Sequence, residues 1–171
     1  MKKLLLLLFC VVSFNLSFGQ DIFGAARAND VAALEGFLKS GADANGKNDK
    51  GYTPLILAVY NESNEATEYL LKNGANPNMQ DGSGNTALMG ATFKGYHTLV
   101  KTLLRYIADV DQANYNDATA LIFAATFGQT EIAKTLLLHG ADKGRKDSRG
   151  KTAYDHALMQ ENAAMIKILM K

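Results

Sequence analysis

The stretch that decides the fold is residues 51–75, which reads GYTPLILAVYNESNEATEYLLKNGA. Gly51 allows a tight turn, Thr53 can cap a helix with its side-chain oxygen, and Pro54 suits a first helical position, where no N–H is needed. The apolar residues that follow recur at helical spacing: Leu55, Ala58 and Val59. The first half of the stretch therefore predicts a short amphipathic helix.

A second helix is predicted in the other half of the same stretch. Ser63 or Asn64 can begin it, and Gly74 can end it by taking the left-handed backbone conformation. Its inward-facing residues are Ala66, Tyr69, Leu70 and Leu71. One such pair of helices cannot bury both of its faces, so the unit requires neighbours of the same kind.

The chain repeats this unit with a period of 33 residues and no insertion. The threonines that begin the first helices are Thr53, Thr86, Thr119 and Thr152. The triplets that follow the second helices are Gly41-Ala42-Asp43, Gly74-Ala75-Asn76, Ile107-Ala108-Asp109 and Gly140-Ala141-Asp142. The paired apolar residues are Leu70-Leu71, Leu103-Leu104, Leu136-Leu137 and Leu169-Met170. Three independent sets of positions with one period indicate a repeat protein.

These motifs resemble the ankyrin-repeat family, whose unit carries Thr-Pro-Leu-His-x-Ala and, later, Leu-Leu-x-x-Gly-Ala. The resemblance extends from about Asp21 to Lys171. It implies an all-α solenoid of about five helix-turn-helix repeats, with turns that project as β-hairpin-like fingers. We expect a domain over residues 20–171, with repeats at about 20–47, 48–80, 81–113, 114–146 and 147–171. Asp21 is expected to open the first helix.

Three departures from the family pattern predict local irregularities. Ile56, Met89, Ile122 and Asp155 stand where the family has histidine. We therefore expect the hydrogen bond from that histidine to the helix-starting threonine to be missing. Ile107 stands where glycine ends the other second helices, and a β-branched residue in the left-handed conformation is strained, unless that helix ends differently. Asp117 replaces the turn glycine, so the 109–117 finger is predicted to be the least regular.

The first residues predict a signal peptide rather than part of the solenoid. Met1-Lys2-Lys3 is a short basic start, and residues 4–12 are an unbroken apolar run. The run is about half of the ~20 residues that a membrane-spanning helix requires. Ser17 and Gly19 place the cleavage site between Gly19 and Gln20, so residues 1–19 are the predicted signal peptide. The alternative is an uncleaved anchor that extends through Phe18.

The single cysteine, Cys10, lies inside the apolar run, so the domain that follows has no thiol and no disulfide. A lipid-modified cysteine is disfavoured because Phe9, not a small residue, precedes it. The absence of thiols suits an oxidising compartment. We therefore expect the protein in the periplasm or outside the cell, with no membrane association after cleavage.

Composition and motifs favour no catalysis, cofactor or metal. The formal charge is +1, from 18 Lys and Arg against 17 Asp and Glu, which gives no push toward nucleic acid. His97, His139 and His156 lack zinc-ligand spacing and are expected at the surface or at helix ends. Gly82-Ser83-Gly84 is explained as a repeat turn rather than a phosphate loop. Three carboxylates lack the pattern of a calcium loop and are expected to be hydrated turn residues: Asp109, Asp111 and Asp117.

The residues at outward, variable positions of the fingers and first helices are candidates for binding another protein. They are Tyr52, Tyr60, Asn61, Phe93, Lys94, Tyr115, Phe127, Lys151, Met159 and Gln160. Aromatic side chains with a few charges are typical of energetic hot spots at protein interfaces. The alternative for Phe93 and Phe127 is packing against neighbouring repeats. A further candidate is the basic finger that contains Lys143, Arg145, Lys146 and Arg149, which suits either solvent or an acidic partner.

Two functions follow from this interpretation. The first is a non-enzymatic, monomeric protein–protein interaction module outside the cytoplasm. The second, suggested by exported members of the family, is an envelope accessory protein that supports a redox or stress enzyme. The sequence contains no feature that separates them.

We predict that the exported protein lacks residues 1–19, because the basic start, the apolar run and the small residues are all aligned with cleavage at Gly19. Intact-mass spectrometry of the protein recovered from its native compartment measures this directly. A species that retains Met1 to Gly19 would support the anchor instead.

Overall fold

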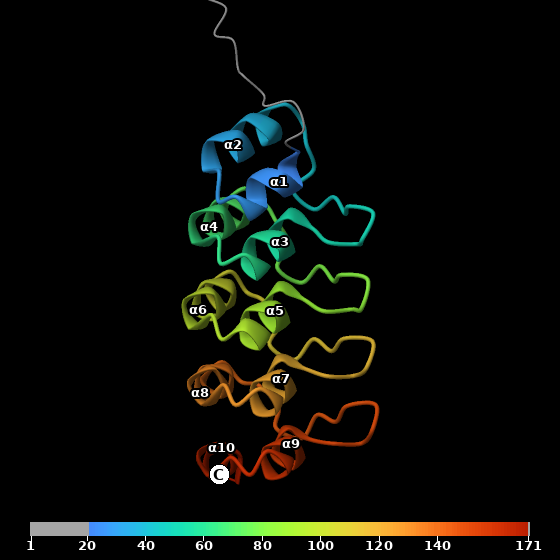
Figure 1. Cartoon of the computed structure of the whole chain (residues 1–171), viewed down its shortest axis with the longest axis vertical. Coiled ribbons are helices and arrows are strands. Elements are labelled where there is room, and N and C mark those ends of the chain that lie inside the picture. The colour runs from blue at the N-terminus through green and yellow to red at the C-terminus, as the bar shows by residue number, and fades with distance from the viewer. Residues whose placement is uncertain (1–20, 171) are drawn as a thin grey trace, which may run out of the picture.

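The computed structural model describes residues 21–170, which form ten helices (Figure 1). The helices are α1 (Ile22–Arg27), α2 (Val31–Lys39), α3 (Pro54–Tyr60), α4 (Asn64–Lys72), α5 (Ala87–Lys94), α6 (His97–Arg105), α7 (Ala120–Thr126), α8 (Thr130–Leu138), α9 (Ala153–Met159) and α10 (Ala163–Met170). They are paired as helix-turn-helix units, which confirms the predicted all-α solenoid of about five repeats. The predicted signal peptide lies outside the described residues.

The helix pairs stack in two layers (Figure 1). The odd-numbered or first helices form one layer and the even-numbered or second helices form the other, and each helix contacts its counterpart in the adjacent pair. Four loops project beyond the layer of first helices, and we call them the 43–52, 76–85, 109–118 and 142–151 fingers. The first helices and the fingers thus lie on the same side of the stack. None of the helices in the described part of the chain is long and apolar enough to cross a membrane.

Threonine caps begin the first helices, as predicted. The Oγ1 atoms of Thr53, Thr86, Thr119 and Thr152 each accept the N–H three residues later, at 3.2 to 3.4 Å. At the first repeat the Asp21 carboxylate takes this role, accepting the N–H of Gly24 at 2.6 Å. Each side chain satisfies an N–H that the helix leaves free, which fixes where the helix starts.

The expectation about the replaced histidine is wrong for the last repeat. The carboxylate of Asp155 accepts both the N–H and the hydroxyl of Thr152 at 2.8 Å, which restores the missing link to the cap. These two hydrogen bonds lower the pKa of Asp155. In the other repeats the replacing side chains are buried in the apolar core: Ile56, Met89 and Ile122.

Each finger turn is organised by one asparagine or aspartate at the same place in the repeat. The four are Asn48, Asp81, Asn114 and Asp147. The Oδ1 atom of each accepts the N–H groups two and four residues later, at 2.8 to 3.0 Å. The N–H of each donates to the carbonyl four residues later, at 2.9 to 3.0 Å, which closes a hairpin-like loop.

The 109–118 finger is regular, which corrects the expectation that Asp117 would disturb it. Asp117 has a φ of 56°, so it takes the left-handed conformation of the turn glycines Gly51, Gly84 and Gly150. Its N–H donates to the Asn114 carbonyl at 2.9 Å, as the glycine does in the other fingers. Aspartate tolerates this conformation better than most residues, because its short polar side chain clashes little with the backbone.

Ile107 confirms the other predicted irregularity. Its φ is 59°, and the helix before it ends as in the other repeats, because the N–H of Ala108 donates to the Leu103 carbonyl at 3.2 Å. The side chain is 85% exposed, so burial does not compensate for the strained backbone. The strained backbone of Ile107 is therefore expected to lower the stability of the protein.

The repeats are also joined by polar contacts along the base of the fingers. Asn45 Oδ1 accepts the N–H of Asn76 at 2.7 Å, Asn78 Oδ1 that of Asp109 at 2.7 Å, and Asp111 Oδ1 that of Asp142 at 2.9 Å. Each of these bonds links one finger to the next at the same register. Together with the buried leucines such as Leu70, Leu103 and Leu136, this ladder sets the spacing of the fingers.

We predict that Ile107→Gly raises the free energy of unfolding by about 1 kcal/mol, because glycine removes the left-handed strain at a site where little apolar surface is lost. Urea denaturation of both proteins measures the difference. The matched control is Gly140→Ile at the equivalent position, where a Cβ would meet nothing within 4 Å. That control should lower the free energy by a similar amount. A loss of stability in Ile107→Gly would contradict the strain argument.

Candidate protein-binding surface

An aromatic pair is formed by Tyr52, at the end of the 43–52 finger, and Tyr60, at the end of α3. The rings of Tyr52 and Tyr60 meet edge to face, with centroids 6.0 Å apart, and both side chains are half-buried. The Tyr60 ring lies over Gly90 of α5, where an added Cβ would be only 3.3 Å from the ring. Burial, followed by the nearby Asp81 carboxylate, raises the pKa of Tyr60 to about 12. This pair is therefore partly a packing element between repeats.

A second aromatic cluster joins the third and fourth repeats. The rings of Phe93 and Phe127 meet edge to face at 4.7 Å, and Phe123 lies 6.0 Å from Phe127. Phe93 is 43% and Phe127 47% exposed, so these rings pack across repeats and also face solvent. Both alternatives for Phe93 and Phe127, an outward-facing position and packing against a neighbouring repeat, describe part of this arrangement.

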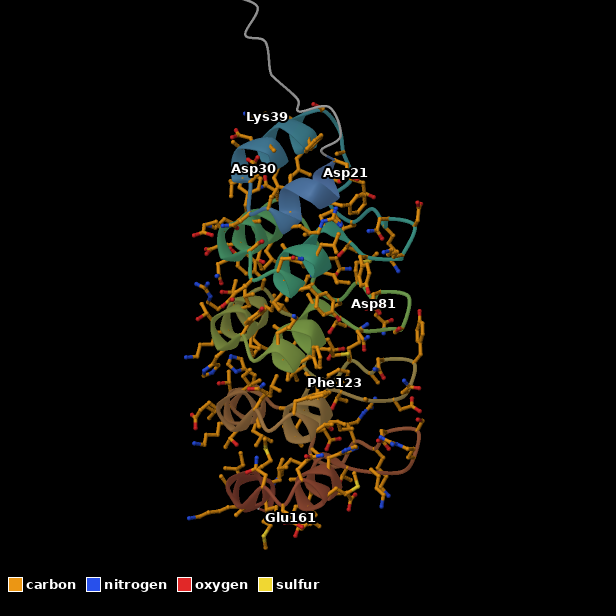
Figure 2. The ribbon with its side chains drawn as sticks, viewed as in Figure 1. Asp21, Asp30, Lys39, Asp81, Phe123 and Glu161 are labelled. Atoms are coloured by element: carbon orange, nitrogen blue, oxygen red, sulfur yellow. The ribbon has the colours of Figure 1, made fainter. Side chains whose placement is uncertain are left out.

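Sequence reasoning missed Phe123. It lies on α7, in the layer of first helices (Figure 2). It precedes Phe127 by four residues, which places the two side chains on one face of the helical turn. That spacing is the signal that could have identified it.

The remaining candidates are exposed but do not join one continuous cluster. Tyr115 is 71% exposed on its finger, where its N–H donates to the Ser83 carbonyl at 3.2 Å and its ring lies against Gly84. The other exposed candidates are Asn61, Lys94, Lys151, Met159 and Gln160. Met159 and Gln160 lie at the end of α9, in the last helix pair of the stack. The densest aromatic surface is therefore the cluster of Phe93, Phe123 and Phe127.

Next to this cluster lies a groove of about 380 Å³ between the fourth and fifth repeats. Its lining comes from α7, α9 and the two adjoining fingers, and includes Ile122, Phe123, Phe127, Ser148, Arg149 and His156. One wall is apolar and the other carries the exposed guanidinium of Arg149. The groove therefore offers an apolar contact and a positive charge side by side.

His156 contradicts the expectation that the histidines lie at the surface or at helix ends. It is only 3% exposed, and its Nε2 lies 2.9 Å from Oδ2 of Asp147, which is also buried. Burial alone would raise the pKa of Asp147, but the N–H of Lys151, His156 and the N–H of Arg149 together lower it. The pair joins the 142–151 finger to α9 beneath the groove.

The other two histidines lie closer to expectation. His139 follows α8 as its cap residue, and its Nδ1 lies 2.8 Å from the Thr135 carbonyl. His97 begins α6 and is half-buried, with its Nε2 2.7 Å from the hydroxyl of Thr135 in the next repeat. Thr135 thus holds both rings, and neither ring faces the groove.

Two of the three carboxylates of the 109–118 finger, those of Asp109 and Asp111, accept backbone N–H groups. Asp109 Oδ1 accepts the N–H of Asp111 at 3.0 Å, and Asp111 Oδ1 accepts that of Asp142. Across residues 21–170, no group of three or more His, Cys, Asp or Glu side chains is placed to hold a metal ion.

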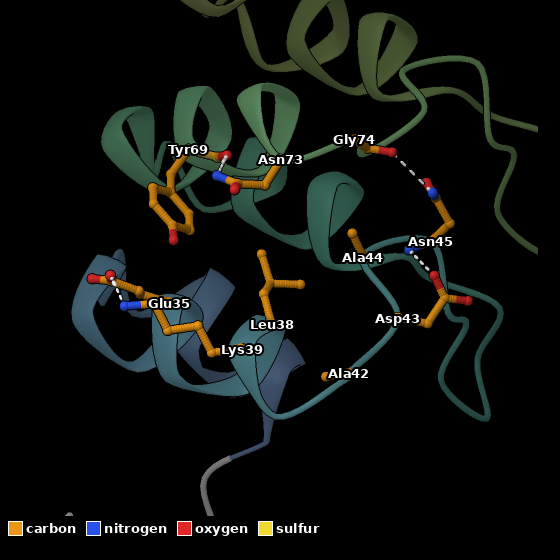
Figure 3. Close-up of a pocket in the computed structure, with 10 residues that line it drawn as sticks. All are labelled: Glu35, Leu38, Lys39, Ala42, Asp43, Ala44, Asn45, Tyr69, Asn73 and Gly74. Atoms are coloured by element: carbon orange, nitrogen blue, oxygen red, sulfur yellow. Dashed lines mark hydrogen bonds and ion pairs between the residues drawn. The ribbon is translucent and has the colours of Figure 1, made fainter.

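A larger hollow of about 480 Å³ lies on the other layer, between α2 and α4 (Figure 3). Several of its polar side chains already have partners within the protein. Lys39 pairs with Glu35 at 2.5 Å, Asn73 donates to the Tyr69 carbonyl at 2.8 Å, and Asn45 donates to the Gly74 carbonyl at 3.0 Å. None of the candidate residues lines it, so the surface of interest remains on the finger side.

We predict that Asp147→Asn lowers the free energy of unfolding at neutral pH by about 1 kcal/mol, because it removes the charged partner of His156. The turn should persist, since Asn48 and Asn114 make the same turn in two other fingers. The contribution of Asp147 is present above its ordinary pKa of 3.8 and is lost as the pH falls through its lower folded-state pKa.

The difference between wild type and Asp147→Asn should accordingly shrink in acid, as measured by urea denaturation at pH values above and below that range. Asp81→Asn is the matched control, because Asp81 organises the same turn without a histidine partner. Equal effects of the two substitutions at every pH would show that the His156 contact adds nothing.

Comparison with known families agrees with this architecture. A family model that describes ankyrin repeats in three copies matches residues 22–114 and 95–171. No curated protein sequence gave a significant match. The matched segments consist of ankyrin repeats alone, which are typically non-catalytic modules for binding other proteins. Because the matches together span most of the chain, it belongs to the ankyrin-repeat family.

Proposed function

We propose that this protein is a non-enzymatic interaction module that binds another protein through its first helices and fingers. The observation that carries the proposal is the cluster of Phe93, Phe123 and Phe127, in which two rings stay nearly half exposed. Half-exposed aromatic rings held on a rigid frame are the usual anchors of a protein interface. The ankyrin-repeat family supports a protein partner rather than a small substrate.

The rigidity of the frame favours affinity. Phe93 and Phe127 are already packed edge to face, so binding a partner would fix few additional rotamers. Neighbouring repeats hold the backbone through helix contacts and the hydrogen-bond ladder at the base of the fingers. A surface of modest size can therefore bind usefully.

We further propose that the protein acts outside the cytoplasm as a monomer, in the periplasm or beyond the cell. The support is the amino-acid pattern of residues 1–19, together with a following domain without cysteine. An accessory role for a redox or stress enzyme of the envelope is one form of this function. The identity of the bound protein decides between that role and a general interaction module.

The proposal predicts that a partner captured by the full-length, carboxyl-terminally tagged chain is lost when Phe93 and Phe127 are both changed to serine. The expected loss is about 2 kcal/mol of binding free energy or more, because the anchors of the interface are removed. Capture from the native compartment identifies the partner, and calorimetric titration then measures the affinity of each variant for it.

Two further variants make the result interpretable. Leu138→Ser removes an 85% exposed apolar side chain from α8 in the other layer, and it should bind as the wild type does. Leu103→Ala, at a fully buried position, should lower the free energy of unfolding by about 2 to 5 kcal/mol. If the phenylalanine variant unfolds as easily as Leu103→Ala, the rings are core packing. If it folds and binds normally, the partner uses another surface.

A further inference from the structure

The 142–151 finger differs in charge from the other three. It carries five basic residues against two carboxylates, whereas the 109–118 finger carries three carboxylates and no basic residue. The basic residues are Lys143, Arg145, Lys146, Arg149 and Lys151. A reversal of charge between adjacent fingers places an electrostatic boundary along the groove that lies between them.

The positive charge of this finger is largely free to act on a partner. Among residues 21–170, Arg149 is the only one of the five in an ion pair, and its Nε is 3.7 Å from Asp147 Oδ2, a carboxylate that also contacts His156. The side chain of Arg149 remains 75% exposed. Lys151 and Lys146 contribute to lowering the pKa of Asp155 on α9, after the two hydrogen bonds from Thr152, so their field reaches the base of the finger.

The two walls of the groove differ, so a ligand that contacts both needs an apolar group and a negatively charged group. Phe123 and Phe127 offer apolar surface from α7, and Arg149 offers a guanidinium from the finger opposite. A guanidinium prefers a carboxylate, with which it forms paired hydrogen bonds. A large apolar side chain on the same ligand would cover the exposed part of the Phe127 ring.

The acidic 109–118 finger favours one orientation of a ligand in the groove and disfavours a polyanion. Asp117 is exposed at the turn of the 109–118 finger, so a negative group near it is disfavoured. A nucleic acid, with charge along its whole length, would place phosphates against both fingers. A ligand with one local negative charge can place that charge near Arg149 and away from Asp117.

We propose that the groove between the fourth and fifth repeats takes a segment of a partner protein in which a large apolar side chain is adjacent to Asp or Glu. The apolar side chain lies on Phe123 and Phe127, and the carboxylate pairs with Arg149 near the end of the 142–151 finger. This inference rests on the proposed function, because it specifies the partner of the same surface.

The test uses a phage-displayed library of random dodecapeptides, selected on the immobilised full-length chain. Enriched peptides should share an aromatic or large aliphatic residue next to Asp or Glu. The best enriched peptide is then synthesised and titrated by calorimetry against Phe127→Ala and Arg149→Ala. Each variant should bind roughly tenfold more weakly. Binding to Arg149→Ala should also depend less on salt concentration, because one charge contact is missing.

The controls remove equivalent groups from the other layer. Lys101→Ala removes one exposed positive charge from α6, and Leu138→Ser removes an exposed apolar side chain from α8. Both should bind the peptide as the wild type does. Thermal melts verify that every variant is folded, and hydrogen exchange on the wild type locates the bound peptide at α7 and the 142–151 finger without any substitution.

Each other outcome overturns the inference. Enriched peptides without acidic residues, or peptide binding that Arg149→Ala leaves unchanged, would show that no carboxylate pairs with Arg149. If Phe127→Ala still weakened peptide binding in that case, the proposed function would stand and only the inferred partner chemistry would fail. Protection from exchange elsewhere, or no enriched peptide, would reject the groove itself, and capture of a partner would then decide the proposed function separately. Tight binding of a fluorescein-labelled single-stranded oligonucleotide, weakened by Arg149→Ala, would assign the basic finger to nucleic acid instead.

Discussion

Contact between successive helix pairs is the interaction on which the rest of this structure depends. A pair such as α5 and α6 is too short to bury both of its faces, so its leucines reach the interior only because a pair lies on each side. The same stacking aligns the fingers, since Asn45, Asn78 and Asp111 each accept an N–H from the next finger. The candidate binding surface is a consequence of that alignment, because Phe93 and Phe127 meet only across a repeat boundary.

The repeat fixes only a few positions of each finger, so the other finger residues can differ from one repeat to the next. The turn of every finger uses an asparagine or aspartate at one position, and the turn tolerates either because only Oδ1 is needed. At the fifth repeat that residue is Asp147, and its second oxygen meets His156. The residues between these fixed points are free to vary, so a regular frame carries an acidic finger, a basic finger and an aromatic cluster close together. Binding specificity in such a protein therefore depends on the side chains at the variable positions of the repeat.

Much of the fold could be predicted because its determinants are local or periodic. The threonine caps, the left-handed Gly74 and the strained Ile107 follow from backbone preferences that act within a few residues. The irregular 109–118 finger was a wrong prediction, because Asp117 adopts the glycine conformation and keeps the turn hydrogen bond. The candidate binding residues were chosen from the same period, and their role in binding stays a prediction. Phe123 was missed, although its spacing of four residues from Phe127 can be read in the sequence. The contact of His156 with Asp147 was hidden because Asp147 lies on another element.

The sequence by itself determined the repeat, its length and the threonine caps of the first helices, since a 33-residue period specifies the same local energetics each time. Only the tertiary structure decided which side chains meet across repeats. The second helix α4 makes the point: Ser63 precedes it, yet Asn29 of the preceding repeat accepts the N–H of Ala66 at 2.8 Å, and Ser63 donates to the Arg27 carbonyl instead. A cap supplied from 37 residues away leaves no local signal, because hydrogen bonding depends on distance in space and not on separation along the chain.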